Sequence, residues 1–170
     1  PSSSSAASDV YKRQGIEDGT VLDYPLVEYC LKNDDLGDPL VSREHILAFK
    51  WMDVFELDFI YEEVRRINDF LQGMFRGVGI KLVDFKVEFG RFEADGKREI
   101  MLADEISPDT CRLWDMRTDK KLDKDRFRND LGNLVEAYQE VAIRLNLLHE
   151  QSNIRPLNYP KPKAVKIKKK

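Results

Sequence analysis

Apolar and polar residues alternate along residues 82–90, and this alternation is the clearest strand signal in the chain. Successive side chains of a strand point to opposite faces of the sheet. The alternation therefore predicts an apolar face with Val83, Phe85, Val87 and Phe89, and a charged face with Asp84, Lys86 and Glu88. From the residues alone, a half-buried sheet with a solvated charged face explains this segment as well as a functional site does.

A hairpin is predicted at the end of this strand. Asp95-Gly96 is a strong turn signal, and residues 100–103 have the composition of a returning strand. An antiparallel return would bring Asp104 close to the charged face that carries Glu88. Earlier in the chain, residues 21–32 are predicted as a strand region interrupted at Pro25, followed by a turn at residues 36–39.

Three helices are predicted from caps and from apolar residues spaced three and four apart. Ser42 would begin a short helix that ends near Phe49, and Asp53 would begin a long helix that ends near Arg76. Asp123 would begin the last helix. Its apolar stripe consists of Phe127, Leu131, Leu134, Tyr138, Val141, Leu145 and Leu148. Strands and helices together predict an α+β domain, in which an antiparallel sheet packs against long helices.

The last helix has basic residues in its first turn, where the helix dipole disfavours cations. They are Lys124, Arg126 and Arg128. Two interpretations stay open: neighbouring Asp123 and Asp125 neutralise these cations, or this end of the helix receives an anion.

Length and composition fit one folded domain. The chain has 170 residues, of which 42% are hydrophobic and 35% charged, and its net charge is −3. No apolar run approaches the ~20 residues of a membrane span. Cys30 and Cys111 lack the spacing of metal ligands, so we expect free thiols and a cytoplasmic protein.

The two ends differ from the body of the chain. Residues 1–14 are read as a translated sequencing adapter, or as a natural disordered tail, and residues 15–150 as the domain. Residues 151–170 hold seven basic residues and no acid, which predicts a flexible solvated tail. Nonspecific contact of this tail with nucleic acid or an acidic partner stays open, but the acidic body argues against a specific nucleic-acid function.

The gathered carboxylates suggest a chemistry. Carboxylates repel one another unless a cation lies between them, and hard oxygen ligands without nearby His or Cys favour Mg²⁺ or Mn²⁺. Mg²⁺ bound by one or two carboxylates usually completes its shell with water and phosphate oxygens. The residues thus point to a phosphate-handling site.

Three ordered motifs resemble the SAICAR synthetase family. They are LVDFKVEFG at residues 82–90, LADEISPDTCRLWD at 102–115 and LDKDRFRNDLGNLVEAYQEVAIRL at 122–145. The resemblance runs from about Gly15 to Leu148 and includes LKND at 31–34 and GDP at 37–39. It implies ATP-dependent ligation of L-aspartate to carboxyaminoimidazole ribotide (CAIR), which gives SAICAR, ADP and phosphate in purine biosynthesis.

The resemblance also implies roles for single residues. Glu88 and Asp104 would bind Mg²⁺, Lys86 would offset negative charge during catalysis, and Lys32 would reach the phosphates of ATP. The ribotide would be bound by Asp84, Asp109, Arg112, Lys124 and Arg128. Structural alternatives are a salt bridge from Arg112 to Asp109 or Asp115, and one from Lys86 to its strand neighbours.

One departure from the family bears on activity. The family has an additional N-terminal lobe that carries much of the ATP site, and a chain that begins at Gly15 would lack it. We therefore expect this chain to form the C-terminal part of the enzyme and to be inactive or impaired by itself. Alternative hypotheses for the function are another Mg²⁺-dependent ATP-using ligase or small-molecule kinase, or a noncatalytic interaction domain. No membrane partner is expected, and homo-oligomer formation is left open.

Overall fold

The structure is a computed structural model that describes residues 15–17, 20–128 and 133–149. The predictions for residues 1–14, residues 151–170 and Leu131 fall outside the described residues. The elements in chain order are β1 (Tyr29–Cys30), the 3₁₀ helix η1 (Asp34–Leu36), β2 (Leu40–Val41), α2 (Arg43–Ala48), α3 (Val54–Gly77), β3 (Ile80–Phe85), β4 (Phe89–Ala94), β5 (Lys97–Leu102), β6 (Cys111–Asp115), α4 (Asp125–Arg128) and α5 (Leu134–Arg144).

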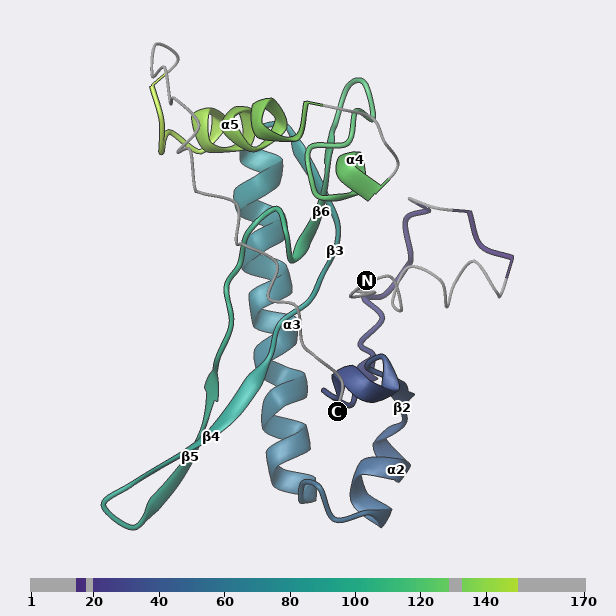
Figure 1. The fold of residues 1–170 in the computed structure, drawn as a ribbon, viewed down its shortest axis with the longest axis vertical. Coiled ribbons are helices and arrows are strands. Elements are labelled where there is room, and N and C mark those ends of the chain that lie inside the picture. Colours follow the sequence, from purple (N-terminus) through teal and green to yellow (C-terminus); the bar gives the residue numbers. More distant parts are fainter. Residues whose placement is uncertain (1–14, 18–19, 129–132, 150–170) are drawn as a thin grey trace, which may run out of the picture.

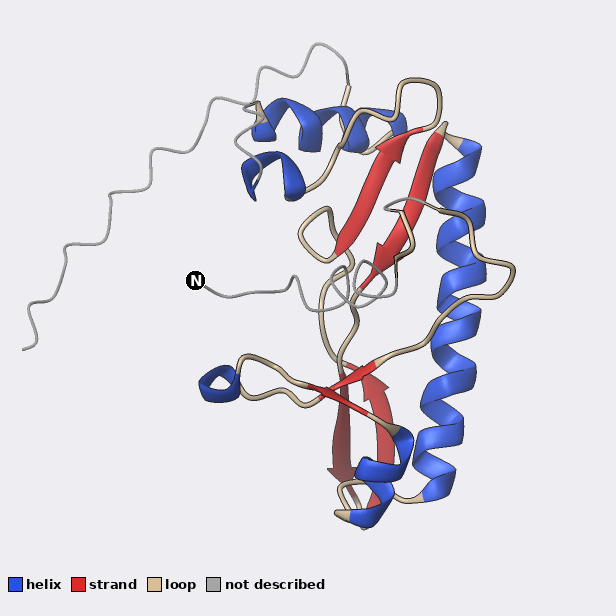
Figure 2. Cartoon of the chain, turned by 90° about the vertical axis from the view of Figure 1, so that its right-hand side faces the viewer, coloured by secondary structure: helices blue, strands red, loops and turns tan. Residues whose placement is uncertain are grey.

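Helix α3 runs along the longest axis of the molecule (Figure 1). Strands β3 and β6 lie beside its C-terminal half, α5 crosses that end, and the β4–β5 hairpin lies near the other end (Figures 1 and 2). Within the described residues, no helix is both long and apolar enough to cross a bilayer.

The predicted caps of α2 and α3 are confirmed. The Ser42 side chain accepts from the backbone N–H of His45, and the Asp53 side chain accepts from that of Glu56. In both helices the third residue also reaches back to the cap, which completes a capping box. Local sequence therefore determines where these helices begin.

The described strands pair in three separate antiparallel ladders, β1–β2, β3–β6 and β4–β5. The strand region predicted over residues 21–32 is much shorter than expected, because only Tyr29–Cys30 pairs, with Leu40–Val41. The turn at residues 36–39 is confirmed, since Gly37 has a φ of 70° and closes η1 with a hydrogen bond to Asp34.

The single strand predicted over residues 82–90 is wrong in extent. The chain pairs with β6 as far as Phe85, leaves the ladder, and pairs again from Phe89 with β5. The β3–β6 register also shifts between Leu82 and Asp84. A shift of this kind places an extra residue in one strand and interrupts the alternation of its faces. As a result Leu82 and Phe85 both pack against the core, although they are three residues apart.

The hydrophobic core lies between α3, β3, β6 and α5. Its buried members are Leu71, Phe75, Ile80, Cys111, Leu113, Leu122 and Val141. Leu82, Phe85 and Leu145 are among the partly buried side chains packed against it. Residues 111–115 of β6 are all buried, so this strand is the centre of the fold.

The predicted hairpin turn is confirmed at Asp95-Gly96. Both residues have positive φ, 52° and 72°, as a tight two-residue hairpin turn requires. The β4–β5 register then runs without interruption from Ala94↔Lys97 to Phe89↔Leu102.

The single helix predicted from Asp123 to Leu148 is replaced by two. Helix α4 ends at Arg128, and α5 begins at Leu134 after Asn133, whose φ of 54° is left-handed and cannot continue a helix. Val141 and Leu145 of the predicted stripe do pack against the core. The packing of Phe127 lies outside the described side chains.

Candidate active site at the junction of the two ladders

Glu88 lies between two lysines in the segment that joins β3 to β4. Lys86 Nζ lies 3.1 Å from Glu88 Oε1, and Lys32 makes a close ion pair with Glu88 Oε2. The Lys32 contact, followed by the Lys86 contact, lowers the pKa of the Glu88 carboxyl. Backbone pairing fixes this segment, since the Lys86 N–H donates to the Thr110 carbonyl at 2.8 Å. Each of the three residues was predicted to belong to a functional site, Lys32 separately from the other two, and the structure brings them together.

Asp104 returns to the same place, as the predicted hairpin requires. The N–H of Ala103 donates to the carbonyl of Glu88 at 2.8 Å, which holds Asp104 one residue beyond the Glu88 backbone. Both acids raise the pKa of the Lys32 ammonium. The hydrogen bond to Glu88 is the main cause, and the charge of Asp104 adds to it. Glu88 and Asp104 thus share one electrostatic environment.

Arg112 is the most enclosed cation among the predicted site residues whose side chains are described. It lies in the middle of β6 with 8% of its side chain exposed, opposite Asp84 in the β3–β6 register. Its Nη2 lies 3.4 Å from Asp84 Oδ2, and its Nε lies 3.2 Å from Asp125 Oδ2. These contacts differ from the alternative salt bridges to Asp109 or Asp115, because the ladder and α4 bring other carboxylates to the guanidinium.

Asp109 and Lys124 lie close to each other, with Lys124 Nζ 3.9 Å from Asp109 Oδ1. The hydroxyl of Tyr138 donates to the same Asp109 oxygen at 2.7 Å. Tyr138 belongs to the predicted apolar stripe of a helix, and that pattern gives no sign of this contact. Arg128 ends α4, and its side chain lies outside the described residues.

The donor set is compatible with Mg²⁺ but is small. Among the described residues, no three His, Cys, Asp or Glu side chains gather in a way that could hold a metal ion. Mg²⁺ commonly needs only one or two carboxylates when water and phosphate oxygens supply its other ligands. Glu88 and Asp104 would supply two such carboxylates, but both oxygens of Glu88 are paired here, one with Lys32 and the other with Lys86.

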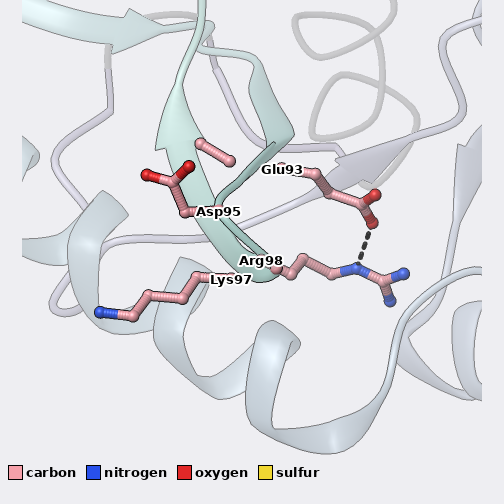
Figure 3. A pocket seen from close by; sticks show the side chains of 6 residues that line it. Glu93, Asp95, Lys97 and Arg98 are labelled. Carbon is pink, nitrogen blue, oxygen red and sulfur yellow. Dashed lines mark hydrogen bonds and ion pairs between the residues drawn. The ribbon is translucent and has the colours of Figure 1, made fainter.

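A surface hollow lies elsewhere, at the tip of the β4–β5 hairpin. It is lined by residues 93–98 of the two strands and their turn (Figure 3). The Glu93–Arg98 ion pair spans it at 2.8 Å, and Asp95 and Lys97 stand beside it (Figure 3). Within the described part of the chain, none of the predicted site residues lines this hollow.

The fold and the site together define an α+β protein in which lysines and a buried arginine are held among carboxylates. A family model for SAICAR synthetase matches residues 3–145, which is most of the chain. The chain therefore belongs to the SAICAR synthetase family. The match begins inside residues 1–14, whose interpretation as an adapter stays a prediction.

Named relatives agree with this assignment. Phosphoribosylaminoimidazole-succinocarboxamide synthase of Pelagibacter ubique is 64% identical over 164 residues, which cover 96% of this chain and 63% of the relative. The crystal structure of the synthase from Ehrlichia chaffeensis is 52% identical, with a TM-score of 0.79 over 82% of this chain and 59% of the other. A SAICAR synthetase solved in complex with ADP is 42% identical, with a TM-score of 0.76 over 82% of this chain and 58% of the other. The chain thus spans about 60% of the length of these proteins.

Proposed function

We propose that this chain contributes part of an active site that ligates L-aspartate to CAIR with ATP, giving SAICAR, ADP and phosphate. Membership of the SAICAR synthetase family is the observation that carries the proposal. The ADP complex of a related synthetase supports ATP as the nucleotide. The gathering of Lys32, Lys86 and Arg112 among carboxylates supports a site for anionic substrates.

The reaction sets a clear task for the protein. A carboxylate resists attack by a nucleophile, because its charge repels the nucleophile and its oxygen is a poor leaving group. Transfer of the γ-phosphoryl group of ATP to the CAIR carboxylate gives an acyl phosphate and ADP. The amine of aspartate then forms the amide bond, and phosphate leaves. The protein contributes mainly positioning and charge neutralisation to such steps.

The acidic and basic residues near the β3–β4 junction fit this task. Glu88 and Asp104 would hold Mg²⁺, which when bound would neutralise charge on phosphate oxygens. Lys86 would offset the charge of the CAIR carboxylate or of the phosphoryl group in transfer. Lys32 is exposed and pairs with the Glu88 oxygen that Lys86 does not contact, and from there it would reach the phosphates of ATP.

The ribotide would lie toward β6 and α4. Arg112 presents a planar guanidinium that can grip a phosphate through two parallel hydrogen bonds. Asp84 and Asp109 would accept hydrogen bonds from hydroxyl groups of the ribotide. Lys124 and Arg128 would add positive charge to this part of the site. Asp84 supports this arrangement, since it faces Arg112 across the ladder.

The central test replaces Glu88 with Gln, which keeps the shape of the side chain and removes its charge. It is made in a chimera, in which the matching part of the Pelagibacter ubique relative is replaced by this chain. Because Glu88 would be a preorganised electrostatic group, we expect ligation to fall at least ~10²-fold. Steady-state kinetics with varied Mg²⁺, ATP, CAIR and aspartate measure the effect.

One control variant and two contrary outcomes make this test specific. Glu93→Gln removes a carboxylate at the hairpin tip, where the side chains of Glu93 and Arg98 are 65% and 62% exposed. This variant should leave ligation unchanged. Near-normal turnover of Glu88→Gln at limiting Mg²⁺ would mean that Glu88 is only a solvated side chain. ADP formation that does not need aspartate would indicate a kinase instead of a ligase.

Arg112→Lys separates binding from chemistry. Lysine keeps the charge but cannot form the two parallel hydrogen bonds of a guanidinium, so we expect a higher KM for CAIR with a smaller change in kcat. The KM for ATP should stay constant. A fall in kcat alone would place Arg112 at the reacting groups and not at the ribotide phosphate.

A further inference from the structure

Asp123 is a carboxylate enclosed between β6 and α4. Only 1% of the residue is exposed. Its Oδ2 accepts a hydrogen bond from the backbone N–H of Leu113 at 2.6 Å, and its Oδ1 accepts one from the N–H of Asp125 at 2.8 Å. The two oxygens of one side chain therefore join the centre of the core strand to the start of the next helix.

The two residues joined in this way are the neighbours that hold Arg112. Leu113 follows Arg112 directly in β6, and Asp125 Oδ2 lies 3.2 Å from Arg112 Nε. The hydrogen bond from the Asp125 N–H to Asp123 restrains the backbone of Asp125. Asp123 thus acts on Arg112 from two directions, through the strand and through the carboxylate of Asp125.

We propose that Asp123 is a positioning residue, which holds Arg112 and Asp125 in the geometry that receives an anionic group of the substrate. The functional half of this inference rests on the proposed function, whereas the positioning of Arg112 does not. Asp123 itself makes its described contacts with backbone groups, so we expect its effect on substrate to pass through Arg112.

The bridge requires an ionised carboxylate. Each oxygen faces a backbone N–H, and a protonated oxygen would present a donor to a donor. Burial raises the pKa of Asp123 to about 6, and the charge of Asp125 adds to this shift. The two backbone hydrogen bonds from Asp125 and Leu113 oppose the shift, as does the charge of Arg112. The groups that face Asp123 are Arg112 and the neutral thiol of Cys111 on β6, and Asp125 on α4. One hydrogen bond of the bridge should therefore be lost as the pH falls through about 6.

NMR of the whole chain tests the positioning directly. In the wild-type protein we expect the Nε–H signal of Arg112 and the amide signals of Leu113 and Asp125 to shift together, with one midpoint near pH 6. Asp123→Asn should shift the same signals at neutral pH and abolish the titration. Asp119→Asn is the matched control, because it removes an exposed carboxylate that pairs with Lys81 at 3.2 Å. Signals of Arg112 that do not titrate in the wild-type protein would overturn the inference, even if Asp123→Asn failed to fold.

Binding of ribose 5-phosphate tests the functional half, with calorimetry at pH 7.5 as the measurement. Loss of one hydrogen bond of the bridge should raise the Kd of Asp123→Asn about tenfold, and Asp119→Asn should bind like the wild-type protein. The wild-type affinity should also fall as the pH is lowered through 6, with the midpoint of the NMR titration. Equal affinities of Asp123→Asn and the wild type would overturn the inference. A wild-type chain that does not bind the probe would instead overturn the proposed phosphate-binding role of Arg112, while the NMR result stands by itself.

Discussion

The β3–β6 and β4–β5 ladders are both two-stranded and antiparallel, yet they are embedded differently. In β6 every residue is buried, and the core side chains of α3 and α5 pack against it. In β5 five of six residues are exposed, and Phe92, Met101 and Leu102 of the hairpin are at least 42% exposed. The two regions therefore do not differ in their backbone hydrogen bonding. They differ in how far their side chains are buried, and burial supplies most of the favourable free energy of folding.

Polar groups follow the same division. Near β6, Asp115 and Asp123 are buried, and each side chain accepts at least two hydrogen bonds. In the hairpin, Glu93 pairs with Arg98 at the surface. The candidate site lies where the two regions meet, at residues 86–88 between β3 and β4. One side of this junction is held by the core, and the other leads into the exposed hairpin.

The largest contrast is expected from truncating one apolar side chain in each region. Leu113 is fully buried, so Leu113→Ala should lower the free energy of unfolding by about 3–5 kcal/mol. Phe92 is 53% exposed, so Phe92→Ala should cost less than about 1 kcal/mol. Urea unfolding of the whole chain measures both values. Equal losses would mean that the hairpin is packed as firmly as β6.

A smaller effect is expected from the carboxylate at the end of β6. Asp115 accepts from Arg144 at 2.6 Å and from the Thr118 hydroxyl at 2.8 Å, and the Arg144 contact chiefly lowers its pKa. Asp115→Asn should lower the free energy of unfolding by about 1.5–3 kcal/mol at pH 7.

The pH dependence gives this prediction its sign. A lowered pKa means that the unfolded state binds the proton more readily, so the contribution of Asp115 is present above pH 3.8 and is lost at lower pH. Wild-type and Asp115→Asn proteins should therefore differ most near neutrality and converge in acid. A constant difference at all pH values would indicate that the hydrogen-bonding shape of Asp115 matters and its charge does not.

Glu56 connects α3 to the hairpin and allows a milder test. It accepts from Arg91 at 2.7 Å, and this contact lowers its pKa to about 2. Glutamine can retain the capping box with Asp53, so Glu56→Gln should remove mainly the ion pair. Because Arg91 is partly exposed to solvent, we expect a loss of about 1 kcal/mol at neutral pH. That loss should disappear as the pH falls from 4.5 toward 2, which unfolding curves at several pH values would detect.

The smallest effect is expected at the tip of the hairpin. Both partners of the Glu93–Arg98 pair are more than 60% exposed, so Glu93→Gln should change the free energy of unfolding by less than about 0.5 kcal/mol. Its effect should shrink further in 0.5 M salt, because the charges are screened. A loss comparable to that of Asp115→Asn would contradict the division between the two regions.

The sequence by itself determined the features that depend on neighbouring residues. The caps at Ser42 and Asp53 and the turn at Asp95-Gly96 could be predicted, because each is formed by side chains or backbone angles within about four positions. The hairpin also predicted the return of Asp104 to Glu88, since a two-residue turn fixes the register of both strands. The charged residues of the candidate site could therefore be predicted from the sequence, whereas their detailed geometry could not.

Tertiary structure decided what depends on distant partners. The strand predicted over residues 82–90 ends at Phe85 because β6 pairs with its first half and β5 with its continuation. Arg112 pairs with Asp84 and Asp125 because the β3–β6 ladder brings one of these carboxylates to the guanidinium and α4 brings the other. Asp123 was predicted to cap the last helix, but α4 begins at Asp125, and the bond of Asp123 to Leu113 and its raised pKa arise from burial against β6. Burial and desolvation are properties of the assembled core, so no pattern within a short segment specifies them.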